Sequence, residues 1–542
     1  MRKKLIAIAL VLSVCAAALT ACGGEENTGS SSNSGSSQNK VVEPNKAAAS
    51  TDNYRNFYQI FVNSFCDSND DGTGDIPGII SKLDYLNDGN PEGGDDLGID
   101  GLWLTPIAQS PSYHKYDVED YCSIDTTFGT MADFEKLIAE CNKRGINVIT
   151  DLVVNHSSKT HEWFKKACEE VKAGKLDGYA KYYHIVKKED ATNGYTQIQG
   201  TDYYYESNFS DTMPELNLSN PDVRKEIKKI MKFWLDKGVA GFRLDAIKYY
   251  DTGGDDGKEF CKWLVDTAHE LKKDSYIVGE NWSGTGSISE WYQTGIDSQF
   301  NFPMSAAIGD YEATVRSENV KKLLKTVKNW NETIQSKNKT AIDCSFLSNH
   351  DMVRSGASLG KNAEKEKMAA MYYMLAPGNP YIYYGEELSL VGSEKDNDGT
   401  YRLPMPWTGN EYEQIAVMNV TFDMAKEAIV DTADKAQKDE NSLFSTYKKL
   451  INLKLQNPEI ARGKITQIIE TANDYMAGYV TEYDGKKVLV MYNASKDKTA
   501  ETTLDSSWQG IAGEVYAKNG SEKAEFTGDT LKMPPHSAVI IR

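Results

Sequence analysis

Four short apolar stretches of the chain each end in side chains that could carry out acid–base or nucleophilic chemistry. These side chains are Asn155 and His156, Arg243 and Asp245, Glu280, and His350 and Asp351. Carboxyl groups serve as nucleophiles or as proton donors when their surroundings tune their pKa values. Each residue taken alone is more commonly structural, because an Asp after a strand often caps a helix and an Arg–Asp pair is often a plain salt bridge. Their occurrence together favours a catalytic site.

The elements that would position these residues are short buried strands that alternate with amphipathic helices. Several of the strands are continuously apolar, which is typical of strands covered on both faces. The eight predicted strands are residues 54–63, 101–105, 147–153, 240–245, 276–279, 298–301, 344–348 and 381–384. One helix is predicted to begin after Thr130, an N-cap with Asp133 three residues on, and to end at Gly145. This alternation predicts an α/β fold, a (β/α)8 or TIM barrel, with its catalytic residues at the carboxyl ends of the strands.

Two stretches depart from the alternation. Residues 157–218 are too long for a loop and are rich in tyrosine, so we expect a small inserted domain after the third strand. The tyrosines are expected to pack this domain, and the alternative is that they add surface on which sugar rings stack. Period-2 runs with polar turns at 475–483, 487–492, 513–516 and 537–541 predict an antiparallel β-domain over 461–542. The barrel is then expected over residues 51–156 and 219–460.

The amino terminus has the features of an export signal over residues 1–21. Three basic residues precede an apolar run at 5–19, which is short for a bilayer span but suits a signal-peptide core. The sequence around Cys22 resembles a bacterial lipobox and implies lipidation of that thiol. Residues 22–50 are mostly small and polar, so we expect a disordered tether. The expected location is the extracellular face of a bacterial membrane, with membrane contact through the lipid anchor only; a soluble secreted protein is the alternative.

Composition narrows the classes of partner. The 542-residue chain carries a formal charge of −19, which disfavours nucleic acid because phosphate binding needs a concentrated positive field. None of its eight cysteines forms a CxxC pair, so neither a zinc knuckle nor a thioredoxin-type site is predicted. Disulfide pairing stays open, and we expect a monomer.

The four strand-end segments resemble those of the alpha-amylase family, glycoside hydrolase family thirteen. Further matches are GIDGLWLTP at 98–106, MPELN at 213–217 and GNPYIYYGE at 378–386, and the likeness runs from residue 54 to residue 542. The resemblance implies a TIM barrel, a domain inserted after strand three, and a C-terminal antiparallel β-sandwich. The MPELN segment is similar to that of an intermediate group between oligo-1,6-glucosidases and neopullulanases.

The resemblance also implies roles for the strand-end carboxyl groups. Asp245 would be the nucleophile, Glu280 the general acid/base, and Asp351 the carboxylate that orients the sugar and stabilises the transition state. Retaining glycosidases need two carboxyl groups about 5–5.5 Å apart, one ionised and one protonated. Arg243 lies two residues from Asp245 on the same strand face and would keep Asp245 ionised, while a drier setting would raise the pKa of Glu280.

The substrate implied by the resemblance is an α-glucan or maltooligosaccharide. Tyr116 would stack on a pyranose ring with His114 beside it, and His156 and His350 would hydrogen-bond the sugar. The full set of expected substrate-binding residues is Tyr113, His114, Tyr116, His156, Arg243, Lys248 and His350.

A calcium site is expected in the loop after the first strand. Residues 67–75 place oxygen-bearing side chains at every second position, which suits a hard cation with six to eight oxygen ligands. By resemblance to an EF-hand-like loop of the family, the ligands would be Asp67, Asn69, Asp71, the Thr73 carbonyl and Asp75. Gly78 stands where an EF-hand has its twelfth-position glutamate, and a solvated acidic turn is the alternative. A second family site at Asn155 stays open, because Tyr249 replaces the usual histidine after Lys248.

The predicted activity is endo-acting hydrolysis of α-1,4 bonds with retention of configuration. Ala246 next to the nucleophile and Lys248 resemble α-1,4-acting members, whereas Glu215, commonly Asp, and the intermediate-group motif leave the linkage open. The alternatives are a transglycosylase, an α-1,6-active glucosidase or neopullulanase on the same barrel, and a non-catalytic glucan-binding lipoprotein.

Overall fold

The computed structural model describes residues 38–47, 50–90, 94–250, 256–392, 397–409, 415–520 and 522–542. The predicted signal peptide, the lipidation at Cys22 and the first part of the tether lie outside these residues. Among the described helices, none is both long and apolar enough to cross a bilayer.

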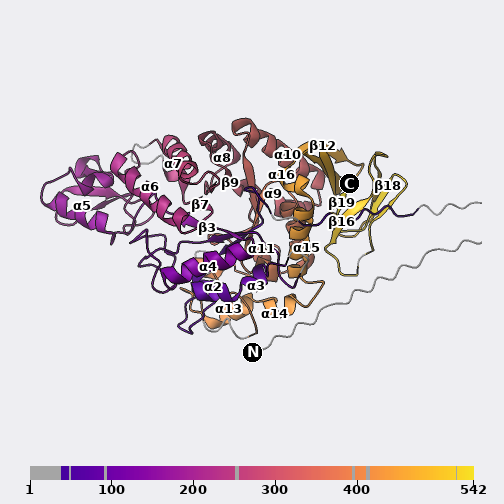
Figure 1. The fold of residues 1–542 in the computed structure, drawn as a ribbon, viewed down its shortest axis with the longest axis horizontal. Helices are drawn as coiled ribbons and strands as arrows, with labels where there is room; N and C mark the ends of the chain where they lie inside the picture. The colour runs from indigo at the N-terminus through magenta and orange to yellow at the C-terminus, as the bar shows by residue number, and fades with distance from the viewer. Residues whose placement is uncertain are drawn as a thin grey trace, which may run out of the picture. The chain divides into compact units, whose positions relative to one another are not determined.

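Eight parallel strands close into a barrel, which confirms the predicted fold class. The strands are β1 (Phe57–Ile60), β2 (Gly101–Leu104), β3 (Asn147–Leu152), β7 (Gly241–Leu244), β8 (Tyr276–Gly279), β9 (Ser298–Phe300), β10 (Ile342–Phe346) and β11 (Asn379–Tyr383). They pair in the order β1-β11-β10-β9-β8-β7-β3-β2, with β2 closing on β1. Most of their residues are buried, because helices cover the outer face of the barrel (Figure 1).

Sixteen α-helices occur in the described part of the chain. The helices that precede strand β10 along the chain are α1 (Val62–Phe65), α2 (Ile76–Ser81), α3 (Leu83–Leu86), α4 (Met131–Lys143), α5 (Glu162–Lys172), α6 (Pro221–Asp236), α7 (Gly257–Leu271), α8 (Thr285–Trp291), α9 (Asp310–Ser317) and α10 (Val320–Lys337). The later ones are α11 (Ser355–Ser358), α12 (Ala363–Met374), α13 (Phe422–Ala428), α14 (Ala433–Ala436), α15 (Leu443–Gln456) and α16 (Pro458–Arg462).

Helix α4 forms as its sequence predicts. The Thr130 hydroxyl accepts a bond from the Asp133 N–H at 3.2 Å, and the Asp133 carboxylate accepts one from the Thr130 N–H at 2.9 Å, which completes a capping box. Phe134 and the other apolar residues of its inner face are buried, as expected. The chain leaves the helix at Gly145, whose φ of +73° is a left-handed conformation that glycine adopts without strain.

The segment inserted between β3 and α6 contains α5 and a three-stranded sheet. Its strands are β4 (Ile185–Lys187), β5 (Tyr195–Gln197) and β6 (Tyr203–Glu206), in the order β4-β6-β5. Tyr183 and Tyr205 are buried against Phe164, with ring centroids 5.0 and 4.7 Å apart, so these two tyrosines pack the segment. A bridge between His156 and Glu215 ties the far end of the segment to the end of β3.

The last part of the chain forms two antiparallel sheets. The five-stranded sheet has the order β12-β13-β14-β19-β16, from β12 (Lys464–Glu470), β13 (Met476–Tyr483), β14 (Lys486–Asn493), β19 (Ser537–Ile541) and β16 (Ile511–Tyr516). The three-stranded sheet has the order β15-β18-β17, from β15 (Ala500–Thr503), β18 (Thr530–Met533) and β17 (Glu525–Thr527). The four predicted runs correspond to β13, β14, β16 and β19, whereas β12, β15, β17 and β18 were not predicted.

The end of the expected tether is not free chain in this structure. Asn39 and Val41 form bridges to Thr527 and Ile511, and the Lys40 N–H donates to the Phe526 carbonyl at 2.7 Å. The partners of residues 39–42 are backbone groups at the edges of the two sheets. Amino-acid composition, on which the prediction of a disordered tether was based, carries no information about such partners. Any flexible tether therefore ends before Asn39 rather than at residue 50.

Candidate active site

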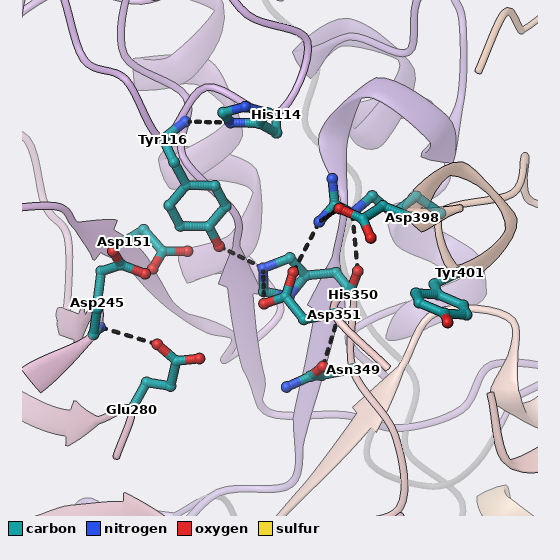
Figure 2. A network of polar contacts seen from close by, with 12 residues as sticks. His114, Tyr116, Asp151, Asp245, Glu280, Asn349, His350, Asp351, Asp398 and Tyr401 are labelled. Carbon is teal, nitrogen blue, oxygen red and sulfur yellow. Dashed lines mark hydrogen bonds and ion pairs between the residues drawn. The ribbon is translucent and has the colours of Figure 1, made fainter. Parts of the chain in front are cut away.

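Three carboxyl groups from separate strand ends line one cavity. Asp245 directly follows β7, Glu280 directly follows β8, and Asp351 lies five residues beyond β10. The cavity has a volume of about 510 Å³ and is lined by all three. Figure 2 shows Asp245 and Glu280 on one side of the site and Asp351, beside His350, on the other. Side chains far apart in the sequence therefore face a common space at the carboxyl ends of the strands, as the barrel fold requires.

Arg243 connects the carboxyl groups on the β7 side. Its Nη1 lies 2.5 Å from Asp245 Oδ1 and also binds Asp151, which is paired with Arg243 across β3 and β7. Its Nη2 lies 3.2 Å from Glu280 Oε2. Because Arg243 is almost completely buried, its charge acts on these carboxyl groups with little screening by water.

The two carboxyl groups nearest Arg243 have different surroundings. Burial raises the pKa of Asp245, but the ion pair and hydrogen bond to Arg243 oppose that shift. Burial raises the pKa of Glu280 to about 7, helped by the neighbouring charges of Asp245 and Asp351 and opposed by Arg243. Arg243 donates directly to Asp245, so the ionised form is favoured there and the protonated form at Glu280.

The conformation after β7 fixes the position of the Glu280 carboxyl group. Ala246 has a φ of +49°, and its N–H donates to Glu280 Oε2 at 2.9 Å. Since Oε2 also faces Arg243 Nη2, a proton on this carboxyl group is better placed on Oε1. A backbone hydrogen bond also fixes the loop after β7 against Glu280, because the Ile247 N–H donates to the Glu280 carbonyl at 2.9 Å.

Asp351 is held in the ionised form by its own partners. Arg402 Nη2 donates to its Oδ1 at 2.8 Å, and His350 Nε2 lies 3.1 Å from its Oδ2. Although burial acts in the other direction, His350, Arg402 and Arg243 together lower the pKa of Asp351. Burial lowers the pKa of His350 to about 3, so its ring is neutral at ordinary pH.

Tyr116 and His350 form a stacked pair next to Asp351. Their rings are 5.6 Å apart and 4° from parallel, and the Tyr116 hydroxyl lies 2.6 Å from His350 Nε2. Gln59 Nε2 is 2.8 Å from Nδ1 and donates there, which leaves the proton of the neutral ring on Nε2. His114 accepts a bond from the Tyr116 N–H at 3.1 Å and so fixes this loop.

His156 presents an unpaired nitrogen in the described structure. Its Nε2 lies 3.2 Å from the Tyr116 carbonyl, while its buried Nδ1 has no partner among the described residues. Burial lowers the pKa of His156 to about 4, so the ring is neutral. Because His156 also lines the cavity, this nitrogen can hydrogen-bond a neutral polar ligand.

The sequence match to a known family agrees with this geometry. Residues 59–463 match the family model described as alpha amylase, catalytic domain. The chain belongs to the alpha-amylase family. It is therefore a glycoside hydrolase of that family, with a catalytic barrel that spans most of its length.

Individual members of the alpha-amylase family are similar over nearly the whole chain. Alpha-amylase 3 of Dictyoglomus thermophilum is 37% identical over 498 residues, covering 90% of this chain and 93% of the relative. An oligo-1,6-glucosidase of Parageobacillus thermoglucosidasius is 30% identical, covering 81% and 89%. The solved structure of Eubacterium rectale Amy13B has a TM-score of 0.83 at 38% identity, covering 92% of this chain and 97% of that one.

The sequence-predicted residues of this alpha-amylase family chain fall into two groups. His114, Tyr116, His156 and Lys248 line the cavity together with the three carboxyl groups. Tyr113, Arg243 and His350 are not among the lining residues and instead contact residues that are: Tyr113 binds Arg402, Arg243 binds Asp245, and His350 binds Asp351.

Several lining residues were not predicted as site residues. Arg402 and Asp398 lie in the segment after β11, and Phe209 lies in the inserted segment. Asp151 was not predicted as a site residue either; it does not line the cavity, but its side chain is buried and binds Arg243. Trp282 was not predicted as a site residue, and it lines the cavity with 44% of its surface exposed. The position of Trp282, two residues after Glu280, was the one local signal.

The predicted calcium loop uses its oxygen atoms within the protein. Asp67 accepts bonds from the N–H groups of Asn69, Asp70 and Gly72, and Asp71 accepts from Thr73. In the part of the chain that the structure describes, no group of three or more His, Cys, Asp or Glu side chains is placed to hold a metal.

Asp75 of the same loop has a structural role. Its carboxylate caps α2 through the Gly78 N–H at 2.6 Å and binds the Ser68 hydroxyl at 2.8 Å. The donor atoms of the loop match calcium chemistry, but their present arrangement is that of a hydrogen-bonded turn. The calcium site therefore stays a prediction.

Proposed function

We propose that this chain is an endo-acting enzyme that cleaves α-1,4-glucosidic bonds of starch and maltooligosaccharides with retention of configuration. The observation that carries the proposal is the unequal sharing of one buried arginine. Arg243 binds Asp245 directly and Glu280 more distantly, which gives one carboxylate and one carboxylic acid at adjacent strand ends. That combination is what double displacement needs.

In the first step, the Asp245 carboxylate attacks the anomeric carbon while Glu280 gives its proton to the glycosidic oxygen. The bond between that carbon and the leaving oxygen breaks, and an ester forms between Asp245 and the sugar. In the second step, Glu280, now ionised, takes a proton from water, and the resulting oxygen nucleophile displaces Asp245. Asp351 stays negative throughout and stabilises the positive charge that develops on the sugar ring.

The walls of the cavity support an oligosaccharide as the substrate. His156 Nδ1 offers a hydrogen-bonding atom without a partner among the described residues. Trp282 and Phe209, which are 44% and 43% exposed, give flat apolar surfaces at the cavity wall. Sugar rings present apolar faces that pack on such surfaces, so a chain longer than one unit can be held on both sides of the cleaved bond.

The linkage is supported by the residues after the nucleophile and by one relative. Ala246 and Lys248 follow Asp245, and Lys248 Nζ lies 3.3 Å from the Trp282 carbonyl at the edge of the cavity. The relative from Dictyoglomus thermophilum is named an alpha-amylase. A second relative is named an oligo-1,6-glucosidase, so α-1,6 hydrolysis is the competing activity.

The test is a product profile on amylose, pullulan and isomaltose, with the first-formed products observed by proton NMR. We expect short maltooligosaccharides from amylose, with their reducing ends first in the α-configuration, and little glucose from isomaltose. Products first formed in the β-configuration would exclude retention, and faster turnover of isomaltose than amylose would favour the α-1,6 activity. Longer products at high maltooligosaccharide concentration would indicate transglycosylation, and no product from any of these glucans would favour a binding protein.

We further propose a calcium ion, a lipid anchor and a monomeric state, all supported by the sequence. Asp67, Asn69, Asp71, Asp75 and the Thr73 carbonyl would hold the ion, which would stiffen the loop after β1. The mature chain would start at Cys22 and be carried on the extracellular face of the membrane. Intact mass of protein extracted from membranes tests the anchor, and light scattering tests the monomer.

A further inference from the structure

Gln59 is a buried polar residue that contacts the site without lining its cavity. It lies in β1, and only 2% of its surface is exposed. Its Nε2 lies 2.8 Å from Nδ1 of His350, which is 291 positions away in the sequence. Its carbonyl accepts a bond from the Tyr384 N–H at 3.0 Å, and strand pairing places it beside Trp103 and Tyr383. The barrel therefore fixes the backbone from which this amide reaches the site.

His350 is completely buried, and its two ring nitrogens face different partners. Nδ1 faces Gln59, whereas Nε2 lies 3.1 Å from Asp351 Oδ2 and 2.6 Å from the Tyr116 hydroxyl (Figure 2). The titratable or charged side chains that act on the ring are Asp351, Tyr116, Arg402, Arg243 and His114. Asp351 favours a charged ring, while burial and the two arginines oppose it and lower the pKa of His350 to about 3.

The amide of Gln59 determines which nitrogen of His350 carries the proton. A glutamine donates through its amide nitrogen, so the ring nitrogen that faces it must offer a lone pair. Nδ1 is therefore unprotonated, and the proton of the neutral ring lies on Nε2. A second proton on Nδ1 would point at the Gln59 N–H, so the same contact also opposes the imidazolium form.

The position of this proton changes what Asp351 and Tyr116 can do. With the proton on Nε2, His350 donates to Asp351 Oδ2 while Arg402 donates to Oδ1 at 2.8 Å. The Tyr116 hydroxyl can then accept from Nε2, which leaves its own proton for a ligand in the cavity that it lines. With the proton on Nδ1, the Nε2 lone pair would face the Asp351 carboxylate and would take up the Tyr116 proton.

We propose that Gln59 is a positioning residue that keeps His350 neutral, with its proton on Nε2, and thereby preserves the negative charge and the orientation of Asp351. This role rests on the function proposed above, in which Asp351 stabilises positive charge on the sugar ring. A glutamate at position 59 would have the same shape but would accept a proton from Nδ1 instead of donating to it. An amide at this position therefore protects the charge balance of the site.

The experiment compares Gln59→Glu and Gln59→Met in the full chain. Gln59→Glu turns the donor into an acceptor, so His350 either gains a second proton or moves its single proton to Nδ1. Gln59→Met removes the donor without adding an acceptor. The control is Asn379→Asp, because Asn379 is buried in β11, its Nδ2 donates to the Asn53 carbonyl at 2.9 Å, and it does not line the cavity.

The protonation of His350 is read by 15N NMR of protein labelled at histidine, because protonated and unprotonated ring nitrogens have different chemical shifts. His350→Asn identifies the signals of His350 among those of the seven histidines. We expect a single proton, on Nε2, in the wild type and in Gln59→Met, and a protonated Nδ1 in Gln59→Glu. A protonated Nδ1 in the wild type at pH 7, or an unprotonated Nδ1 in Gln59→Glu, would overturn the proposal.

The effect on catalysis is measured by hydrolysis of a chromogenic maltooligosaccharide, with thermal unfolding as a check on folding. We expect Gln59→Glu to lower kcat by about 10- to 150-fold with little change in KM, which is the effect of losing one hydrogen bond to a charged group. Gln59→Met should lower kcat by no more than about threefold, because Asp351 still favours a proton on Nε2. Asn379→Asp should keep its kcat. If Gln59 only filled space, Gln59→Met would be at least as harmful as Gln59→Glu, and that result would contradict the proposal.

Failure of the proposed function gives a different result from failure of this role of Gln59. A wild type that hydrolyses no α-1,4-glucan would refute the proposed function, and the NMR signals of His350 would still decide the position of its proton. A wild type that hydrolyses these glucans, with a folded Gln59→Glu variant that keeps kcat within about twofold, would refute the role of Gln59 alone. Equal losses of kcat in Gln59→Glu and Asn379→Asp would refute it as well, because any buried carboxylate would then have the same effect.

Discussion

We expect replacement of Arg402 to impair catalysis, because this residue holds Asp351 in position. Its guanidinium group donates through Nη2 to Asp351 at 2.8 Å, through Nε to the His350 carbonyl at 2.9 Å, and through Nη1 to Tyr113. It is buried, and one further contact, to Asp398, is longer at 3.5 Å. In Arg402→Met, Asp351 keeps its negative charge but loses the group that orients it.

The size of the effect follows from the lost contact with Asp351. A hydrogen bond to a charged group contributes about 1.5–3 kcal/mol, which corresponds to about a 10- to 150-fold change in rate. Because Asp351 acts mainly on the charge that develops in the transition state, the loss should appear in kcat and kcat/KM together, with little change in KM. A lysine in Arg402→Lys can restore one contact but not the several fixed donors of the planar guanidinium group. The kcat of Arg402→Lys should therefore lie between those of the wild type and Arg402→Met.

The assay is steady-state hydrolysis of a chromogenic maltooligosaccharide, with thermal unfolding as a check on folding. Arg462→Met is the matched control, because Arg462 also donates to an aspartate, Asp52, but does not line the cavity. We expect the control to keep its kcat. If Arg402→Met retained kcat within about twofold while folded, the orientation of Asp351 by Arg402 would not matter for the reaction.

Three further predictions follow from the site. Because Glu280 must be protonated and its pKa is raised to about 7, kcat/KM should be high below pH 7 and fall above it; a profile that stays flat to pH 9 would contradict this assignment. Trp282→Ala should raise KM for long maltooligosaccharides by about tenfold with a smaller effect on short ones, and an equal effect on both would argue against a stacking role. A chelator should lower the unfolding temperature of the wild type but not of Asp67→Asn combined with Asp71→Asn; no shift in either protein would argue against calcium at this loop.

The parts of the fold that could be predicted are those specified by local pattern. Strand β8 matches the predicted run at 276–279. The polar residues on both sides of this short apolar segment mark where the strand begins and ends. Helix α4 matches because Thr130, Asp133 and Gly145 signal both of its ends. Short edge strands such as β15 and β17 carry no strong period-2 pattern, and their pairing partners decide whether they form.

The same division applies to the site. Asp245 and Glu280 were predictable because each directly follows a barrel strand. Arg402 was not, because its contact with Asp351 joins residues 51 positions apart in the sequence through a segment without regular periodicity. Asp151 lies within the predicted strand 147–153, but its contact with Arg243 depends on the register that pairs the two residues across β3 and β7. Register of this kind is a property of the closed barrel and not of either strand.

The central claim is that Asp245 forms the covalent bond to the sugar, and trapping that bond tests it most directly. The Glu280→Gln variant is incubated with α-maltosyl fluoride, whose leaving group needs no proton, and then digested with trypsin. Cleavage after Arg243 and Lys248 gives the peptide LDAIK, in which Asp245 is the only side-chain carboxyl group. We predict a maltosyl adduct on this peptide. An adduct on another peptide, or consumption of the fluoride with direct release of β-maltose and no adduct, would contradict the proposed mechanism.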